Sequence, residues 1–169
     1  MQELNTLKNL HYMKPLNEFL NDEKQYTKLN EGKMHTIVSE LATEFKAEVK
    51  TNQYDWALEP FMTNKVWTKM NGRKYKEPGK FRVNIYRNDD KETVDEKRQV
   101  QNNFWPWLIK QSGVKSMGEV SGEFEGAGYS EAVEYKGVVF IKRKDTDKYT
   151  ITEYFSKGRF KNSGMWNQK

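Results

Sequence analysis

The sequence predicts an α+β protein with a largely antiparallel sheet, and three observations lead to this prediction. Apolar residues recur at helical spacing over 33–50 and again over about 93–111. Apolar and polar residues alternate over 81–86, and three more strand patterns follow one another after residue 128. Strands joined in succession by short turns pair as antiparallel neighbours, which is typical of α+β domains. We therefore expect about five strands with two to three helices, ending in a C-terminal β-meander.

A single domain over residues 1–169 is the simplest organisation. The chain is long enough to bury a core, and it contains no internal repeat or low-complexity linker. The mean hydropathy is low, at −1.01, and 36% of the residues are apolar. The 14% aromatic content compensates, because each ring buries a large area. Residues 1–30 are weakly patterned, and residues 157–169 are expected to form either a basic tail or a late edge strand.

The N-terminal third is expected to be helical. Pro15 suits the first turn of a short helix with Leu16, Phe19 and Leu20 on one side. The clearer helix covers 33–50, where an apolar face lies opposite a charged one. That apolar face consists of Met34, Ile37, Val38, Leu41, Phe45 and Val49.

The first pair of strands is expected to form a hairpin. Residues 81–86 show the period-2 alternation of a half-buried strand. Residues 65–70 are its expected partner, across a long basic turn that contains Asn71-Gly72 and Pro78-Gly79. Asp89-Asp90 is expected to end the second strand.

A second helix is expected to follow. Thr93 and Glu96 form a capping-box pattern at its start. Pro106 is expected to break or kink this helix near Trp105, because proline lacks an N–H and clashes with the preceding turn. Gly113 is a suitable stop. The predicted buried stripe consists of Val100, Phe104, Trp107, Leu108 and Gln111.

The C-terminal meander is predicted from strand patterns at 129–135, 138–144 and 148–155. Its middle strand begins with four apolar residues, which favours a central position covered on both faces. Residues 120–125 are expected to add one further strand.

Several classes of protein are excluded by composition. The sequence contains no cysteine, so it has no disulfides, thiol catalysis or cysteine metal ligands. No apolar run approaches the ~20 residues that a membrane span needs. The N-terminus lacks the apolar segment of a secretory signal. We therefore expect a cytoplasmic protein without a membrane partner.

No catalytic constellation emerges from the motifs. His11 and His35 do not stand at metal-ligand spacing. There is no nucleophile-elbow motif, and the glycines of 122–128 do not match a phosphate-binding loop. We therefore predict no catalytic residue, no metal site and no cofactor.

Charge is sorted into blocks along the chain. Residues 61–91 carry 9 Lys/Arg against 3 Asp/Glu, and residues 137–169 carry 8 against 3. Both blocks are interleaved with aromatic residues, and basic charge with rings is how many proteins bind nucleic acid. The predicted nucleic-acid-binding residues are Arg73, Lys74, Arg82, Tyr86, Lys142, Arg143, Lys144, Arg159, Lys161 and Trp166.

The leading expectation is a small binding protein without catalysis that engages nucleic acid or nucleic-acid-processing machinery. Its size and its excess of lysine over arginine, 23 to 6, suit a phage-type accessory protein or an inhibitor of a host factor.

Two alternatives stay open. The first is a protein–protein interaction module that uses Trp105 and the acidic stretch 119–134, with homodimerisation as one form of it. The second is a Mg²⁺-dependent nuclease, because Glu134-Tyr135-Lys136 matches the E-x-K fragment of such enzymes.

Overall fold

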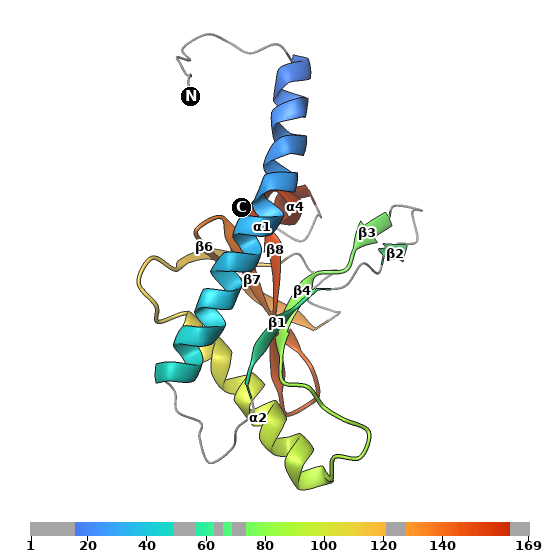
Figure 1. The fold of residues 1–169 in the computed structure, drawn as a ribbon, viewed down its shortest axis with the longest axis vertical. Coiled ribbons are helices and arrows are strands. Elements are labelled where there is room, and N and C mark those ends of the chain that lie inside the picture. The colour runs from blue at the N-terminus through green and yellow to red at the C-terminus, as the bar shows by residue number, and fades with distance from the viewer. Residues whose placement is uncertain (1–15, 49–56, 63–65, 69–73, 121–127, 163–169) are drawn as a thin grey trace.

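The protein is described by a computed structural model over residues 16–48, 57–62, 66–68, 74–120 and 128–162 (Figure 1). Its elements are, in chain order, α1 (Leu16–Glu48), β1 (Glu59–Phe61), β2 (Val66–Thr68), β3 (Lys74–Lys76), β4 (Gly79–Arg82), α2 (Lys91–Leu108), β5 (Lys115–Glu119), β6 (Tyr129–Tyr135), β7 (Val138–Lys144), β8 (Thr150–Ser156) and α4 (Lys157–Asn162). A six-stranded antiparallel sheet has the order β1-β4-β8-β7-β6-β5, and β2 and β3 form a separate two-stranded ribbon. The predicted α+β class is confirmed, with one strand more than expected in the main sheet.

The meander β6–β7–β8 forms where the sequence predicts it. Lys136 and Gly137 connect β6 to β7, and both have positive φ, 51° and 83°. Two successive residues of that conformation give a hairpin turn whose twist matches the flanking strands. The turn sets the register, in which Tyr135 pairs with Val138. β7 pairs on its other side with β8, so it is central as predicted.

The expected hairpin of 65–70 with 81–86 is wrong. β2 pairs with β3, whereas β4 lies between β1 and β8. The strand also ends at Arg82, because the next backbone donors bond to side chains. The N–H of Val83 donates to the Gln101 amide oxygen of α2 at 3.0 Å, and the N–H of Tyr86 donates to Asp89 at 2.8 Å.

Helices α1 and α2 cover one face of the main sheet (Figure 1). Phe45 of α1 meets Phe104 of α2 edge to face, with ring centroids 5.2 Å apart. Phe104 in turn lies 4.4 Å from Phe81 of β4. These rings form the centre of the core that joins both helices to the sheet.

α2 differs from the prediction in the residue that caps its N-terminus and in the face of the helix that is buried. The N-cap is Asp90, whose carboxylate accepts the N–H of Thr93 at 2.8 Å. Pro106 lies in the last turn, so the helix runs on to Leu108 instead of breaking at Trp105. The residues buried on α2 are Lys97, Val100, Gln101, Phe104, Trp105 and Leu108.

The protein–protein alternative uses Trp105 as its anchor, but this side chain is only 4% exposed and belongs to the main core. The buried stripe is rotated toward Trp105 because two polar residues, Lys97 and Gln101, lie within it. Lys97 is neutralised by Asp89, and Gln101 accepts the Val83 N–H. Trp105 therefore cannot act as an exposed anchor for a partner.

The other face of the sheet carries a second, smaller core. α4 packs there through Phe160, so the first part of the expected tail is helical and residues 163–169 lie outside the described residues. β5 precedes the strand expected at 120–125, of which 121–125 also lie outside the described residues. The second core consists of Val120, Tyr129, Ala132, Val139, Ile141, Phe155 and Phe160. None of the helices in the described parts of the chain is long and apolar enough to span a membrane.

Candidate nucleic-acid interface

The sheet face opposite α1 and α2 brings together arginines and aromatic rings from distant parts of the sequence. Side chains alternate between the two faces along each strand. Because Phe81 and Tyr154 pack into the helix-covered core, Arg82 and Glu153 belong to the opposite face. We call this surface the arginine face, defined by Arg82, Arg143 and Arg159.

Arg82 lies on an aromatic ring at the β1 edge of the sheet. Its guanidinium carbon is 3.7 Å from the centroid of Phe61, a ring that is 37% exposed. Phe61 and Arg82 come from neighbouring strands, where Phe61 pairs with Lys80 and Glu59 with Arg82. Within the described residues Arg82 forms no ion pair, and its Nε is buried without a hydrogen-bond partner. The cation–π contact therefore fixes a guanidinium that has no ion pair with a carboxylate of the described residues.

Arg143 lies two strands away, on β7, and is held by two groups. Its Nη1 donates to the Glu153 carboxylate at 3.0 Å, and its guanidinium carbon is 5.1 Å from the centroid of Tyr129. Tyr129 also donates its hydroxyl to Glu153 at 2.7 Å. The Arg143 side chain is 36% exposed, whereas that of Glu153 is only 3% exposed. The carboxylate is thus buried below an arginine that reaches the surface.

Arg159 provides the third arginine–aromatic contact. It lies on α4, with its guanidinium carbon 5.8 Å from the centroid of Phe155 on β8. Phe155 belongs to the second core, on the same face as Tyr129. Three of the six arginines in the chain therefore lie over rings on one face.

The β2–β3 ribbon is separate from the main sheet and is followed in the chain by β4, after Glu77 and Pro78. It projects from the body of the protein on the side away from α1 (Figure 1). Residues 65–76 carry five Lys/Arg and no Asp/Glu. Trp67 pairs with Tyr75 and Thr68 with Lys74, and Lys74 is exposed. Arg73, which the sequence predicts as a binding residue, lies outside the described residues.

The other predicted residues lie apart from the arginine face or are engaged elsewhere. Tyr86 is 60% exposed, and its ring lies 4.8 Å from the Lys97 ammonium at the α2 side. Lys142 pairs with Glu131 at 3.4 Å, and Lys144 pairs with Asp147 at 3.5 Å.

The strand expected over 81–86 ends at Arg82, so Arg82 and Tyr86 do not share a strand face. Lys142 and Arg143 are adjacent on β7 and therefore lie on opposite faces of the sheet. Lys161 is exposed on α4, and Trp166 lies outside the described residues.

The structure gives no metal-binding surroundings to the E-x-K fragment within the described residues. Glu134 forms an ion pair with Lys157 at 2.9 Å, and Lys136 occupies the tight β6–β7 turn. Among the described residues, no group of three or more His, Asp or Glu is arranged to hold a metal ion. The nuclease alternative therefore still rests on the sequence fragment alone.

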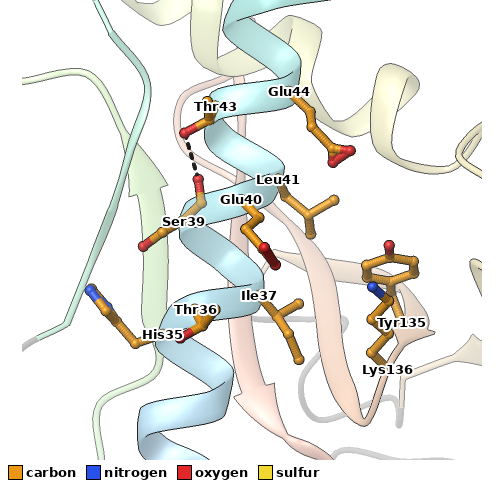
Figure 2. Close-up of a pocket in the computed structure, with 10 residues that line it drawn as sticks. All are labelled: His35, Thr36, Ile37, Ser39, Glu40, Leu41, Thr43, Glu44, Tyr135 and Lys136. Atoms are coloured by element: carbon orange, nitrogen blue, oxygen red, sulfur yellow. Dashed lines mark hydrogen bonds between the residues drawn. The ribbon is translucent and has the colours of Figure 1, made fainter.

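A hollow of about 660 Å³ lies between α1 and the β6–β7 turn. Figure 2 shows Tyr135, at the end of β6, and Lys136 of the turn across from Ile37, Leu41 and Glu44 of α1. His35, Ser39, Glu40 and Thr43 of α1 also line this hollow. It is an open groove whose lining combines the apolar Ile37 and Leu41 with charged residues of α1 and of the turn, and it lies on the helix-covered side of the protein.

Four residues of the arginine face were not predicted: Phe61, Tyr129, Glu153 and Phe155. Only Glu153 gives a sequence signal, because it lies on a strand face between Ile151 and Phe155. An acid flanked by apolar residues at period two indicates a buried carboxylate with a basic partner. The rings give no such signal, because their contacts depend on which strands become neighbours. Comparison with protein-family models, with curated proteins and with solved structures finds no match for this chain.

Proposed function

We propose that this protein binds nucleic acid through the β2–β3 ribbon and the arginine face. The observation that carries the proposal is the set of three arginines, each over an aromatic ring, on one sheet face of a chain that also carries a ribbon segment of high positive charge. A two-stranded ribbon fits the major groove of duplex DNA, and a partly exposed ring such as Phe61, at 37%, can stack on an unpaired base.

Arginine is the cation best suited to this role. Its planar guanidinium binds phosphate with two parallel hydrogen bonds, and it keeps its charge at every physiological pH. A ring below the guanidinium restricts its rotation, so less conformational entropy is lost when a phosphate binds. Arg82 and Arg143 both fit this description.

The experiment is fluorescence anisotropy with labelled single-stranded and duplex DNA and RNA of equal length. Affinity is measured from about 50 to about 200 mM salt, because phosphate contacts release counterions. Lys74→Gln/Lys76→Gln in the ribbon is expected to make the slope of log affinity against log salt shallower by about 1.8 for duplex DNA.

The matched control is Lys46→Gln/Lys115→Gln. It removes the same charge from two exposed lysines, on α1 and on β5. A control that leaves the slope unchanged supports the proposal, because net charge alone does not then explain the ribbon's effect. If none of the four nucleic acids binds at low salt, the proposed function is wrong.

The specific role that the sequence predicts is an accessory protein or inhibitor acting on nucleic-acid-processing machinery in the cytoplasm. Adding Mg²⁺ to the same assay tests the nuclease alternative, since cleavage that is lost in Glu134→Ala would require an active site there.

A protein partner is the remaining alternative, and the groove of Figure 2 is the feature that favours it. Its test is a nuclease-treated pull-down, compared between the native protein and Glu40→Gln/Glu44→Gln. Retention of one and the same protein by the native chain alone would favour the groove.

A further inference from the structure

Glu153 is an acid in the middle of the sheet. It lies on β8, where it pairs with Lys80 of β4 on one side and with Ile141 of β7 on the other. Glu153 is 2% exposed, and both of its carboxylate oxygens accept hydrogen bonds, one from Tyr129 and the other from Arg143. A buried carboxylate is costly unless it is paired and hydrogen-bonded, and here both conditions are met.

Such a buried pair is weak evidence for stability, because apolar residues of the same volume often stabilise a core equally well or better. The arrangement does, however, fix the position of Arg143. Glu153 binds one end of the guanidinium, and the Tyr129 ring lies beside it. Burial raises the pKa of Tyr129, so its hydroxyl remains a donor to Glu153 throughout the physiological range.

The donors of Arg143 are only partly used. A guanidinium has five N–H groups. Within the described residues, Nη1 bonds to Glu153, whereas Nε is buried and has no hydrogen-bond partner. A buried donor without a partner costs free energy unless a ligand or ordered water satisfies it. More than a third of the side chain is nevertheless exposed, so a ligand can approach the guanidinium from solvent.

We propose that the Arg143 guanidinium binds one phosphate group. Glu153 and Tyr129 are positioning residues that hold the Arg143 side chain in place. This inference rests on the proposed nucleic-acid function for its biological ligand. It assigns the β7–β8 part of the arginine face to a single preorganised phosphate contact, distinct from the charge of the β2–β3 ribbon.

The first test uses the binding assay described above. Arg143→Gln is expected to weaken binding about tenfold, as for loss of one charged hydrogen bond. The salt slope should become shallower by about 0.9 for duplex DNA or 0.7 for a single strand. Arg143→Lys keeps the charge, so it should retain the slope while losing affinity.

If Glu153 positions Arg143, replacing Glu153 should also weaken binding. Glu153→Gln should weaken binding about as much as Arg143→Gln, and the double variant should be no weaker than either, because the residues act as one unit. Thermal unfolding of each variant is measured alongside. A purely structural role would lower the unfolding temperature while leaving the salt slope unchanged, and that result overturns the inference.

Arg98 offers a matched control. Its side chain is 33% exposed, and its Nε lies 3.7 Å from the Asp145 carboxylate as an ion pair. Within the described residues this buried Nε also lacks a hydrogen-bond partner, but Arg98 lies on α2 and not on the arginine face. Arg98→Gln is expected to leave affinity and slope unchanged. If it matches Arg143→Gln, the effect is general charge and the assignment of Arg143 is wrong.

A second measurement separates this inference from the proposed function. Inorganic phosphate is titrated while the Arg143 Nε–H resonance is followed by NMR, in the native protein and in Glu153→Gln. A saturating shift that Glu153→Gln abolishes supports the site even if no nucleic acid binds. If the ribbon variant weakens binding but phosphate does not move this resonance, the inference fails and the proposed function stands.

Discussion

Gly79 is the position where a single added methyl group should disturb the core most. A Cβ at Gly79 would lie 2.3 Å from Cζ of Tyr154 and within 2.8 Å of two more ring atoms. The ring would have to retreat by about 1.1 Å to reach an ordinary contact distance of 3.4 Å. It has little room, because it is 1% exposed and its centroid lies 5.3 Å from that of Phe81 and 6.4 Å from that of Phe140.

The backbone cannot relieve this contact either. Gly79 and Tyr154 are register partners in the β4–β8 ladder, so moving the strands apart breaks sheet hydrogen bonds. Overpacking of this kind costs about 1–3 kcal/mol, and we expect Gly79→Ala to lie near 3 kcal/mol. The assay is urea unfolding followed by tryptophan fluorescence and circular dichroism.

Gly32→Ala is the control, because nothing lies within 4 Å of a Cβ there. As a glycine inside α1, Gly32 should give a gain of about 0.5–1 kcal/mol when replaced by alanine. Gly79→Ala combined with Tyr154→Leu should be less destabilised than the sum of the single changes by at least about 1 kcal/mol. A Gly79→Ala protein within about 0.5 kcal/mol of the native free energy of unfolding would refute the clash.

Three further predictions concern buried polar groups. Tyr154→Phe should be neutral or stabilising by up to about 1 kcal/mol in urea unfolding, because the buried hydroxyl has no hydrogen-bond partner among the described residues; a loss of more than about 1 kcal/mol would contradict this. Gln101→Leu leaves the buried N–H of Val83 unpaired and should cost about 1–3 kcal/mol, whereas Gln101→Glu keeps the acceptor. The hydrogen bond from Lys97 lowers the pKa of Asp89 below 3.8, so its contribution is present above that pH and is lost as pH falls through the lowered value. The stability difference between the native protein and Asp89→Asn should therefore shrink in acid, and a pH-independent difference would contradict the assignment.

The parts of the fold that the sequence predicts are those set by local patterns. The meander is one of them, since alternation defines its strands and Lys136-Gly137 defines the turn. The chain segment around β1 is the opposite case. β1 has three residues with a proline in the middle, so it lacks a strand pattern and depends on pairing with β4. The position of β2 was predicted, but its partner was not. The sequence pattern favoured pairing with 81–86, whereas β2 pairs with the nearer segment β3.

α2 shows how a helix can be predicted and its buried face misassigned. The apolar residues alone favour a stripe that includes Trp107, which is only partly buried. The actual stripe includes Lys97 and Gln101, residues that no hydropathy pattern places inside a protein. Their burial is possible only because Asp89 and the Val83 N–H lie opposite them in the folded chain. Tertiary hydrogen bonding therefore decided the phase, and with it the burial of Trp105.

The candidate site combines the same two kinds of information. Its arginines were predicted from charge, whereas the rings below them were not, because strand order brings those rings into place. The lysine–tyrosine contacts of Lys136 with Tyr135 and of Lys148 with Tyr149 join residues adjacent in the sequence, so they need no particular fold.

The arginine contacts differ in this respect. Arg82 meets a ring 21 positions away, and Arg143 meets one 14 positions away, each across neighbouring strands. In a chain with 23 lysines and 6 arginines, this placement of two arginines over rings on one face is the feature on which the proposed recognition of phosphate geometry, as opposed to nonspecific charge attraction, depends. Replacing Arg82 and Arg143 by lysine, which preserves the net charge, is therefore the substitution that most directly separates these two modes of binding.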